Sequence, residues 1–211
     1  MLSNGGVWVF DVRRQVRNRI VGESLAADPI WTADGNSVIF TKTVGEEAEL
    51  YEVPADGSRA PSLLLARPEG QYAHSVTPDG QTIAFYEHGD GTRRDIWTLR
   101  RGDEPMPFLI TEANERSPSF SPDSRWMAYT SDVSGRDEVY VRRFPEGDSR
   151  EIISLQGGRE PVWSRDGTKL FYRRVNEFWM VEVSLLPELT VSEPRLLFAG
   201  RYQRVGVVTG S

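Results

Sequence analysis

The sequence predicts an all-β chain folded as a β-propeller of four-stranded antiparallel blades, and three observations predict it. A short pattern, a hydroxyl residue followed by any residue, then Asp and a small residue, occurs four times. Its acidic residues are Asp34, Asp79, Asp123 and Asp166, which stand 45, 44 and 43 residues apart. Short apolar runs follow each copy. A period of about 40–45 residues with several short strands per unit is typical of propeller blades.

The repeated pattern is expected to form the turn between strands A and B, where the strands of a blade are lettered from the propeller axis outward. In Ser121-Pro122-Asp123-Ser124, proline presets φ at the second turn position and the Asp side chain bonds back to nearby backbone. Gly35, Gly80 and Gly167 hold the last position, where positive φ costs glycine little. Ser124 departs from this, so its turn is expected to be less stable.

Strands B and C are expected after each turn. Strand B is a nearly continuous apolar run, as in strands buried on both faces, at 37–41, 82–86, 126–130 and 169–172. Strand C carries one aromatic residue at the same place in every repeat, which predicts packing between blades: Tyr51, Trp97, Tyr140 and Trp179. Strand D is shorter, at 62–66, 108–111, 151–154 and 195–198. Arg142 stands where the other repeats have an apolar residue, so a slipped register is possible there.

The expected blades form one continuous domain over residues 1–211. Four complete blades are expected at 25–69, 70–113, 114–157 and 158–200. A partial blade is expected at 5–24, with strands C and D at 7–12 and 19–21, and a further strand A is expected to begin within 201–211. Partial terminal blades leave open edges. We therefore expect a piece of a larger propeller, with closure by pairing of the end strands or by a second copy as alternatives.

The repeat resembles the TolB-like, WD40-like (PD40) propeller repeat, in which Ser-Pro-Asp-Gly precedes an apolar strand and an Asp-Ile-Tyr-Val-type strand. Here that corresponds to Ser121-Pro122-Asp123, Met127-Ala128-Tyr129 and Glu138-Val139-Tyr140-Val141. Segments 157–167 and 170–173, with 7–11 and 194–198, also look like the propeller that follows the kinase domain in many bacterial serine/threonine protein kinases. That resemblance implies a sensor part of a larger bacterial signalling protein, whose kinase domain is a separate unit.

Composition excludes several classes of function. The net charge of -6 and the scattered arginines argue against nucleic-acid binding, which usually needs a basic surface. Two His and no Cys make a zinc site improbable, and we expect no metal and no cofactor. No nucleophile elbow, phosphate loop, dinucleotide fingerprint or kinase motif occurs, so no catalytic residue is predicted. No signal peptide and no membrane-inserting segment is expected. The compartment stays open, with a position outside the cytoplasm favoured.

A candidate recognition surface lies where each strand A begins, at the mouth of the central channel. If the blades close, six polar or aromatic side chains would converge there: Asp28, Tyr72, His74, Arg116, Arg159 and Glu160. The two arginines are suited to binding carboxylate groups. The alternative interpretation is that these are ordinary loop residues, solvated or paired with one another.

Three functions remain open. The first is a non-catalytic module that binds a protein, a peptide or a small ligand at the channel face, with self-association through open blade edges as a further option. The second is the substrate-gating propeller of a prolyl-oligopeptidase-like serine peptidase. The third is a propeller hydrolase or lactonase with a metal in the channel, for which Asp28 and Glu160 are too few ligands.

Overall fold

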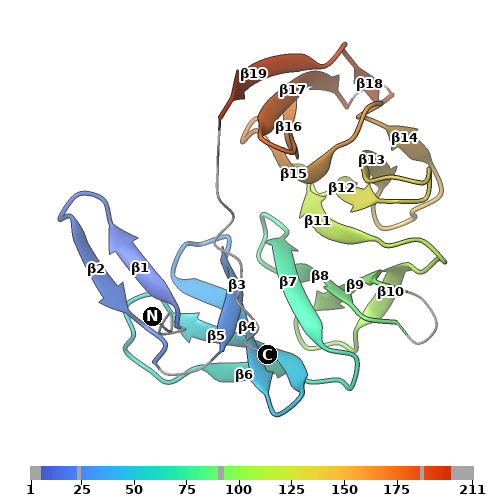
Figure 1. Ribbon diagram of the computed structural model, residues 1–211. Helices are drawn as coiled ribbons and strands as arrows, with labels where there is room; N and C mark the ends of the chain where they lie inside the picture. Colours follow the sequence, from blue (N-terminus) through green and yellow to red (C-terminus); the bar gives the residue numbers. More distant parts are fainter. Residues whose placement is uncertain (1–5, 23–24, 90–92, 186–187, 201–211) are drawn as a thin grey trace.

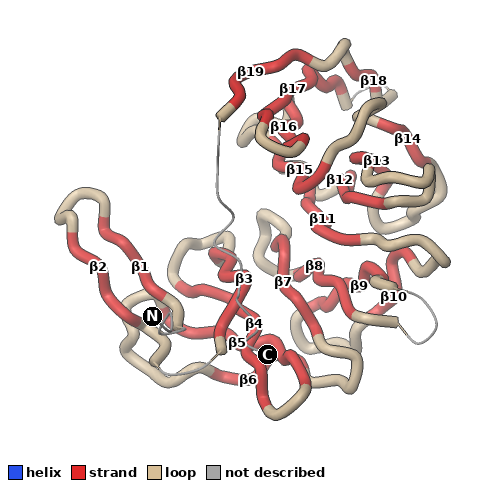
Figure 2. The backbone as a smooth tube through the Cα atoms, in the orientation of Figure 1, coloured by secondary structure: helices blue, strands red, loops and turns tan. Residues whose placement is uncertain are grey.

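The computed structural model describes residues 6–22, 25–89, 93–185 and 188–200, and every regular element in these ranges is a β-strand. The strands form five antiparallel sheets that follow one another along an open arc (Figure 1). Figure 2 shows the same path with strands joined only by loops and turns. The predicted all-β propeller architecture is confirmed. The segment expected to begin another strand A, at 202–209, lies outside the described residues.

The first sheet is a hairpin of β1 (Trp8–Asp11) and β2 (Val16–Arg19). Its return strand was predicted at 19–21, and that prediction is wrong by three residues at its start. The Asp11 carboxylate accepts two backbone N–H groups of the turn, at 2.9 and 3.0 Å. This closes a short turn, so pairing resumes at Val16.

Four complete sheets follow, and we call them blades 1 to 4. Blade 1 consists of β3 (Ala26–Trp31), β4 (Ser37–Val44), β5 (Glu47–Pro54) and β6 (Ser62–Leu65). Blade 2 consists of β7 (Gln71–Val76), β8 (Thr82–Glu87), β9 (Asp95–Arg100) and β10 (Met106–Leu109). Blade 3 consists of β11 (Arg116–Phe120), β12 (Trp126–Ser131), β13 (Glu138–Arg143) and β14 (Arg150–Ile152). Blade 4 consists of β15 (Arg159–Trp163), β16 (Lys169–Arg174), β17 (Glu177–Ser184), β18 (Thr190–Val191) and β19 (Arg195–Ala199).

Within blades 1 to 3, chain order is also spatial order. Blade 4 differs because two strands share the outer edge of β17: the two-residue β18 pairs with its end, and β19 pairs with its first half. The strand D predicted at 195–198 is β19, whereas β18 was not predicted.

The repeated turn has one construction in all four blades. A threonine or serine hydroxyl donates to the Asp Oδ1 two residues later and accepts the backbone N–H five residues later. The donor–acceptor distances to Asp34, Asp79, Asp123 and Asp166 are 2.6, 2.6, 2.5 and 2.6 Å. The hydroxyl bond, followed by a backbone N–H bond, lowers the pKa of Asp34 and of Asp166 to about 2. Ser124 adopts φ 57°, in the left-handed region used by the glycines of the other turns.

The core lies between successive blades. The strand B residues Ile39, Ile83 and Met127 are fully buried, as their apolar runs predict. Each strand C aromatic residue packs against the preceding sheet, which confirms the predicted inter-blade role: Tyr51, Trp97, Tyr140 and Trp179. Tyr140 is buried, a change worth about 1.5–3 kcal/mol of transfer free energy, and the other three, which are partly buried, gain less.

Arg142 shows no slipped register. It pairs with Met127 just as Val53 pairs with Val38 and Val181 with Leu170, four residues after the turn Asp in each case. Its Nε donates to the Tyr129 hydroxyl at 2.9 Å, and its guanidinium also reaches the Gly147 carbonyl. An arginine fits this apolar position because its donors have acceptors within the blade.

The A strands β3, β7, β11 and β15 contact one another in order and form the inner edge of the arc (Figure 1). Side-chain hydrogen bonds join successive blades, and two junctions use a threonine at the same repeat position, Thr41 and Thr130. Thr41 Oγ1 donates to a backbone carbonyl of blade 2 at 3.2 Å, and Ser75 Oγ accepts the Phe120 N–H at 3.0 Å. Thr130 Oγ1 accepts the Glu160 N–H at 3.1 Å, and the Trp163 indole donates to a blade 3 carbonyl at 3.1 Å. These bonds fix the positions of the strand beginnings that carry the candidate site.

Candidate functional site

All six candidate side chains belong to the first residues of the A strands. Asp28 lies on β3, Tyr72 and His74 on β7, Arg116 on β11, and Arg159 and Glu160 on β15. The loops between strands B and C lie at this same end of each blade, opposite the repeated turns. We call these strand beginnings, together with the B–C loops, the rim.

Each A strand begins with a bulge, where its pairing with strand B shifts register. In three blades the bulge places Asp28, Ser117 or Glu160 at φ 49°, 53° or 55°, directly before a proline. Left-handed backbone costs a non-glycine residue about 1–2 kcal/mol, so the surrounding sheet must hold it. Blade 2 has Ala73 and His74 instead. Bulges re-aim neighbouring side chains, and here they act on the rim residues.

The rim of blade 2 carries an aromatic cluster. Tyr72 and Tyr86 stack with ring centroids 4.8 Å apart. His74 lies 5.3 Å from the Tyr86 ring, His88 lies 5.8 Å from Tyr72, and the Arg94 guanidinium sits 5.4 Å from the Tyr86 centroid. Partial desolvation, and then the Arg94 charge, lowers the pKa of His88. The cluster is therefore an aromatic surface with one cation against it.

The rims of blades 3 and 4 share a charged cluster. Arg116 Nη2 and Arg159 Nε each lie 2.5 Å from Oδ2 of Asp137. Asp137 is in the B–C loop of blade 3, so it reaches both its own strand A and that of blade 4. Glu160 is joined instead to Arg173, at 3.0 Å. Asp28 is exposed on blade 1.

The predicted six residues thus form groups on neighbouring blades. The structure brings Tyr72 and His74 together through Tyr86, and Arg116 and Arg159 together through Asp137. Sequence reasoning missed the residues that make these links, which are Tyr86, His88, Arg94, Asp137 and Arg173. The sequence did contain a signal for Tyr86 and Arg173. Blades 1 and 3 have a threonine at this repeat position, Thr41 and Thr130, and the two larger side chains depart from that pattern. Asp137 had no such signal, since it belongs to a loop of variable length.

Buried carboxylates gather behind the aromatic cluster. Glu87 lies 3.2 Å from Arg67, and its side chain is 3% exposed. Burial, only partly offset by Arg67, raises its pKa to about 7, and Glu69 and Asp95 add to the rise. Burial also raises the pKa of Glu115. Among the described residues, several buried atoms here have no hydrogen-bond partner: Glu69 Oε2, Glu87 Oε2, Arg94 Nε, Trp97 Nε1, Asn114 Oδ1 and Glu115 Oε2.

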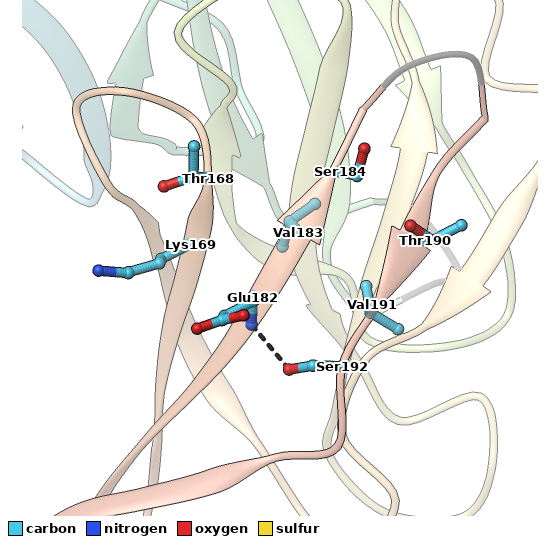
Figure 3. Close-up of a pocket in the computed structure, with 8 residues that line it drawn as sticks. All are labelled: Thr168, Lys169, Glu182, Val183, Ser184, Thr190, Val191 and Ser192. Carbon is cyan, nitrogen blue, oxygen red and sulfur yellow. Dashed lines mark hydrogen bonds between the residues drawn. The ribbon is translucent and has the colours of Figure 1, made fainter.

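A shallow depression of about 440 Å³ lies on blade 4 between β16, β17 and β18 (Figure 3). Its wall includes Lys169, Glu182 and the hydroxyls of Thr168, Ser184, Thr190 and Ser192. Ser192 Oγ accepts the Glu182 N–H at 2.9 Å, the dashed contact in Figure 3. Both histidines of the chain are on blade 2, so a serine here has no imidazole to act as its base.

Two further searches cover only the described part of the chain. No group of three or more His, Asp or Glu side chains is arranged there to hold a metal ion. No helix there is long and apolar enough to cross a membrane.

Comparison with solved structures identifies the architecture. TolB from Acinetobacter baumannii superposes with a TM-score of 0.69, covering 92% of this chain and 49% of that one, at 15% sequence identity. This chain has a TolB-like β-propeller fold. The predicted resemblance to the TolB-like repeat is thereby confirmed at the level of fold, whereas the link to kinase propellers is not tested by it.

Curated relatives agree with this fold. The Tol-Pal system protein TolB of Bordetella pertussis is 31% identical over 138 residues, which is 64% of this chain and 31% of that protein. The uncharacterized peptidase YuxL of Bacillus subtilis is 25% identical over 155 residues, which is 56% of this chain and 23% of that protein. The chain thus spans less than a third of either relative. No family model matches the sequence.

Proposed function

We propose that this chain is a non-catalytic recognition module that binds a protein or peptide at the rim, as the sensor part of a larger bacterial signalling protein. The observation that carries the proposal is the contrast within each blade: the turn end has the same hydroxyl–Asp pair and bonds four times, whereas the rim carries an aromatic cluster on blade 2 and a charged cluster on blades 3 and 4. Scaffolds of this kind carry function in the variable part of the repeat. The TolB relatives and the resemblance to kinase-linked propellers support this assignment.

The charge of the chain favours a protein partner over a nucleic acid. A net charge of -6 repels a phosphate backbone, and the arginines of the rim are held by acidic neighbours of the same chain. Guanidinium groups beside stacked aromatic rings are typical of surfaces that bind peptides. A small ligand at the same surface is the alternative occupant.

Site-specific photo-crosslinking in cells tests the proposal. A photoreactive phenylalanine analogue would replace the exposed His88 at the rim or, as the matched control, the exposed Gln81 at the turn end of the same blade. We expect a discrete protein adduct from position 88 alone, identified by mass spectrometry. Equal adducts from both positions, or none from position 88 and from a second rim position at Arg159, would contradict rim recognition.

A peptidase gate is the second candidate: the YuxL relative is named a peptidase, which does not favour this candidate over the first. In this case the catalytic domain would lie elsewhere in the same polypeptide. Sequencing the gene on both sides of this segment distinguishes the two proposals. A kinase domain upstream supports the sensor, and a downstream hydrolase domain with a Gly-x-Ser-x-Gly elbow supports the gate.

The hairpin supports self-association as an additional property. Its outer face exposes 48% of Trp8 and 57% of Phe10, with the Arg17 guanidinium 5.3 Å from the Trp8 ring centroid. We propose that this face contacts further β-structure. Sedimentation of the wild-type chain and of a Trp8→Ser, Phe10→Ser variant tests it: concentration-dependent association is expected only for the wild type, and identical behaviour of both would contradict it.

A further inference from the structure

The charged cluster at the rim is positive in an acidic chain. Arg116 and Arg159 meet one carboxylate, that of Asp137, so two positive charges face one negative charge. Both contacts use the same oxygen, Oδ2, at 2.5 Å. The chain as a whole carries a net charge of -6. A local excess of one positive charge on this background marks a place where an added carboxylate would be attracted.

The two arginines differ in exposure, and the difference shows which one can meet a partner. The side chain of Arg116 is 19% exposed and that of Asp137 is 12% exposed, whereas that of Arg159 is 57% exposed. Arg159 contacts Asp137 through Nε. Within the described residues, its terminal Nη atoms take part in no hydrogen bond. A guanidinium binds a carboxylate through two parallel N–H groups, and the edge formed by the two Nη atoms offers such a pair.

Asp137 therefore has two effects. It orients the Arg159 guanidinium, which lowers the entropy lost when a ligand binds. It also neutralises part of the charge that would attract that ligand. The neighbouring blade adds the surface of Tyr72, His74 and Tyr86, whose rings can pack against an apolar or aromatic side chain of the same ligand. The aromatic cluster is on β7, which contacts β11, the strand of Arg116, and β11 in turn contacts β15, the strand of Arg159.

From this arrangement we propose that the rim binds an acidic peptide segment of its partner, with a carboxylate on the exposed Nη edge of Arg159 and an aromatic residue against the cluster of blade 2. Asp137 acts as a resident carboxylate that positions the arginines and limits the affinity. This inference rests on the proposed function, because it names the chemistry of the segment that the rim would recognise.

A pair of synthetic peptides tests it by NMR titration of the intact chain. The first probe is acetyl-Glu-Asp-Phe-Glu-Asp-amide, and the neutral control is acetyl-Gln-Asn-Phe-Gln-Asn-amide. The acidic probe should shift the Arg159 side-chain signal, which is assigned by its loss in Arg159→Lys, and its binding should weaken as salt is raised. The neutral probe should bind at least about tenfold more weakly, because one charge-assisted pair is lost.

Three variants sharpen the result. Arg159→Gln should weaken binding of the acidic probe about tenfold, whereas Arg165→Gln, an exposed arginine at the turn end of the same blade, should not change it. Asp137→Asn keeps the shape of the side chain and removes its charge, so it should strengthen binding several-fold. Equal binding of both peptides, or weaker binding by Asp137→Asn at an unchanged melting temperature, would overturn the proposal. Rim crosslinks to a native partner, obtained without binding of the acidic probe, would remove this inference and leave the proposed function standing.

Discussion

The two ends of each blade follow opposite rules. At the turn end, all four blades use one hydroxyl, one Asp and the same backbone bonds, with oxygen–oxygen distances that agree within 0.1 Å. At the rim, the A-strand beginnings differ between blades except that β11 and β15 both start Arg-x-Pro, and the rim side chains form an aromatic cluster on blade 2 and a charged cluster on blades 3 and 4. The comparison teaches that the repeat specifies the fold from one end and leaves the other end open to specialisation.

The largest expected change in stability comes from Glu138, a residue at the rim end of blade 3 that holds the fold together. It tests whether every rim residue is free to vary. Glu138, which is 1% exposed, accepts the Ser154 hydroxyl at 2.5 Å and the Gly157 N–H at 2.9 Å. Glu138→Ala should lower the free energy of unfolding by about 3 kcal/mol, because these donors lose a charged acceptor. Chemical denaturation measures it. Glu177→Ala, at the same position of blade 4, removes only the bond from the Trp179 indole and should cost about 1 kcal/mol. Equal losses would contradict this account.

A smaller change in the free energy of unfolding, which depends on pH, is expected when Glu87 is replaced. Its pKa rises from 4.5 to about 7 on folding, so its contribution to stability is complete below pH 4.5 and is lost as pH rises through 7. Glu87→Gln should raise the unfolding free energy at pH 8 by on the order of 2–3 kcal/mol and change it little at pH 5. Melting curves of both proteins from pH 5 to pH 8 measure this. Glu52→Gln, which breaks the partly exposed pair with Arg101, is the control and should leave the pH dependence unchanged.

The turn end can be broken by removing one hydroxyl. Ser121→Ala should destabilise the chain by about 1–2 kcal/mol, because Ser121 is fully buried and its loss leaves the Trp126 N–H without an acceptor. Ser164→Ala removes the matching hydroxyl from a more exposed turn, so water can replace it and the loss should be smaller. Denaturant midpoints of the two variants measure the difference. A larger loss for Ser164→Ala would show that the four turns are not equivalent in the way described.

The smallest expected effect is an increase in stability. Ser124→Gly should stabilise the third turn by about 0.5–1 kcal/mol, since glycine adopts positive φ without the steric cost that serine meets at φ 57°. The reverse change, Gly80→Ser, should cost a similar amount at φ 73°, where an added Cβ would meet only the Ala33 Cβ at 3.8 Å. Thermal melting measures both. If both variants were destabilised, backbone strain would not explain the difference between the turns.

Local rules predicted most of the fold. The turn residues, the apolar B strands and the C strand aromatics all lie where the period of the repeat predicts them, because each is determined by contacts that recur in every blade. Prediction was weaker where a side chain decides a boundary, as Asp11 does at the hairpin turn, and where one β-strand serves two partners, as β17 does.

The candidate site was predicted less completely than the fold. The A strand positions identify which residues lie at the rim, but the links through Tyr86 and Asp137 depend on hairpin register and on loop conformation, which a repeat alignment does not contain. Arg142 illustrates the same limit. Its residue type indicated a displaced strand, and the buried Tyr129 hydroxyl that accepts its hydrogen bond could be seen only in three dimensions.

The polar contacts between blades bear on how such an array can evolve. Thr41 and Thr130 stand at the same repeat position, and each accepts the backbone N–H of an equivalent residue in the next blade, Ala73 at 3.4 Å and Glu160 at 3.1 Å. Blade 2 has Tyr86 at this position, and its junction with blade 3 uses Ser75 instead. Exchanging blades 1 and 3 would therefore preserve this bond, whereas blade 2 in the place of either would lack the threonine. Recombination between repeats is thus more restricted for blade 2 than for blades 1 and 3.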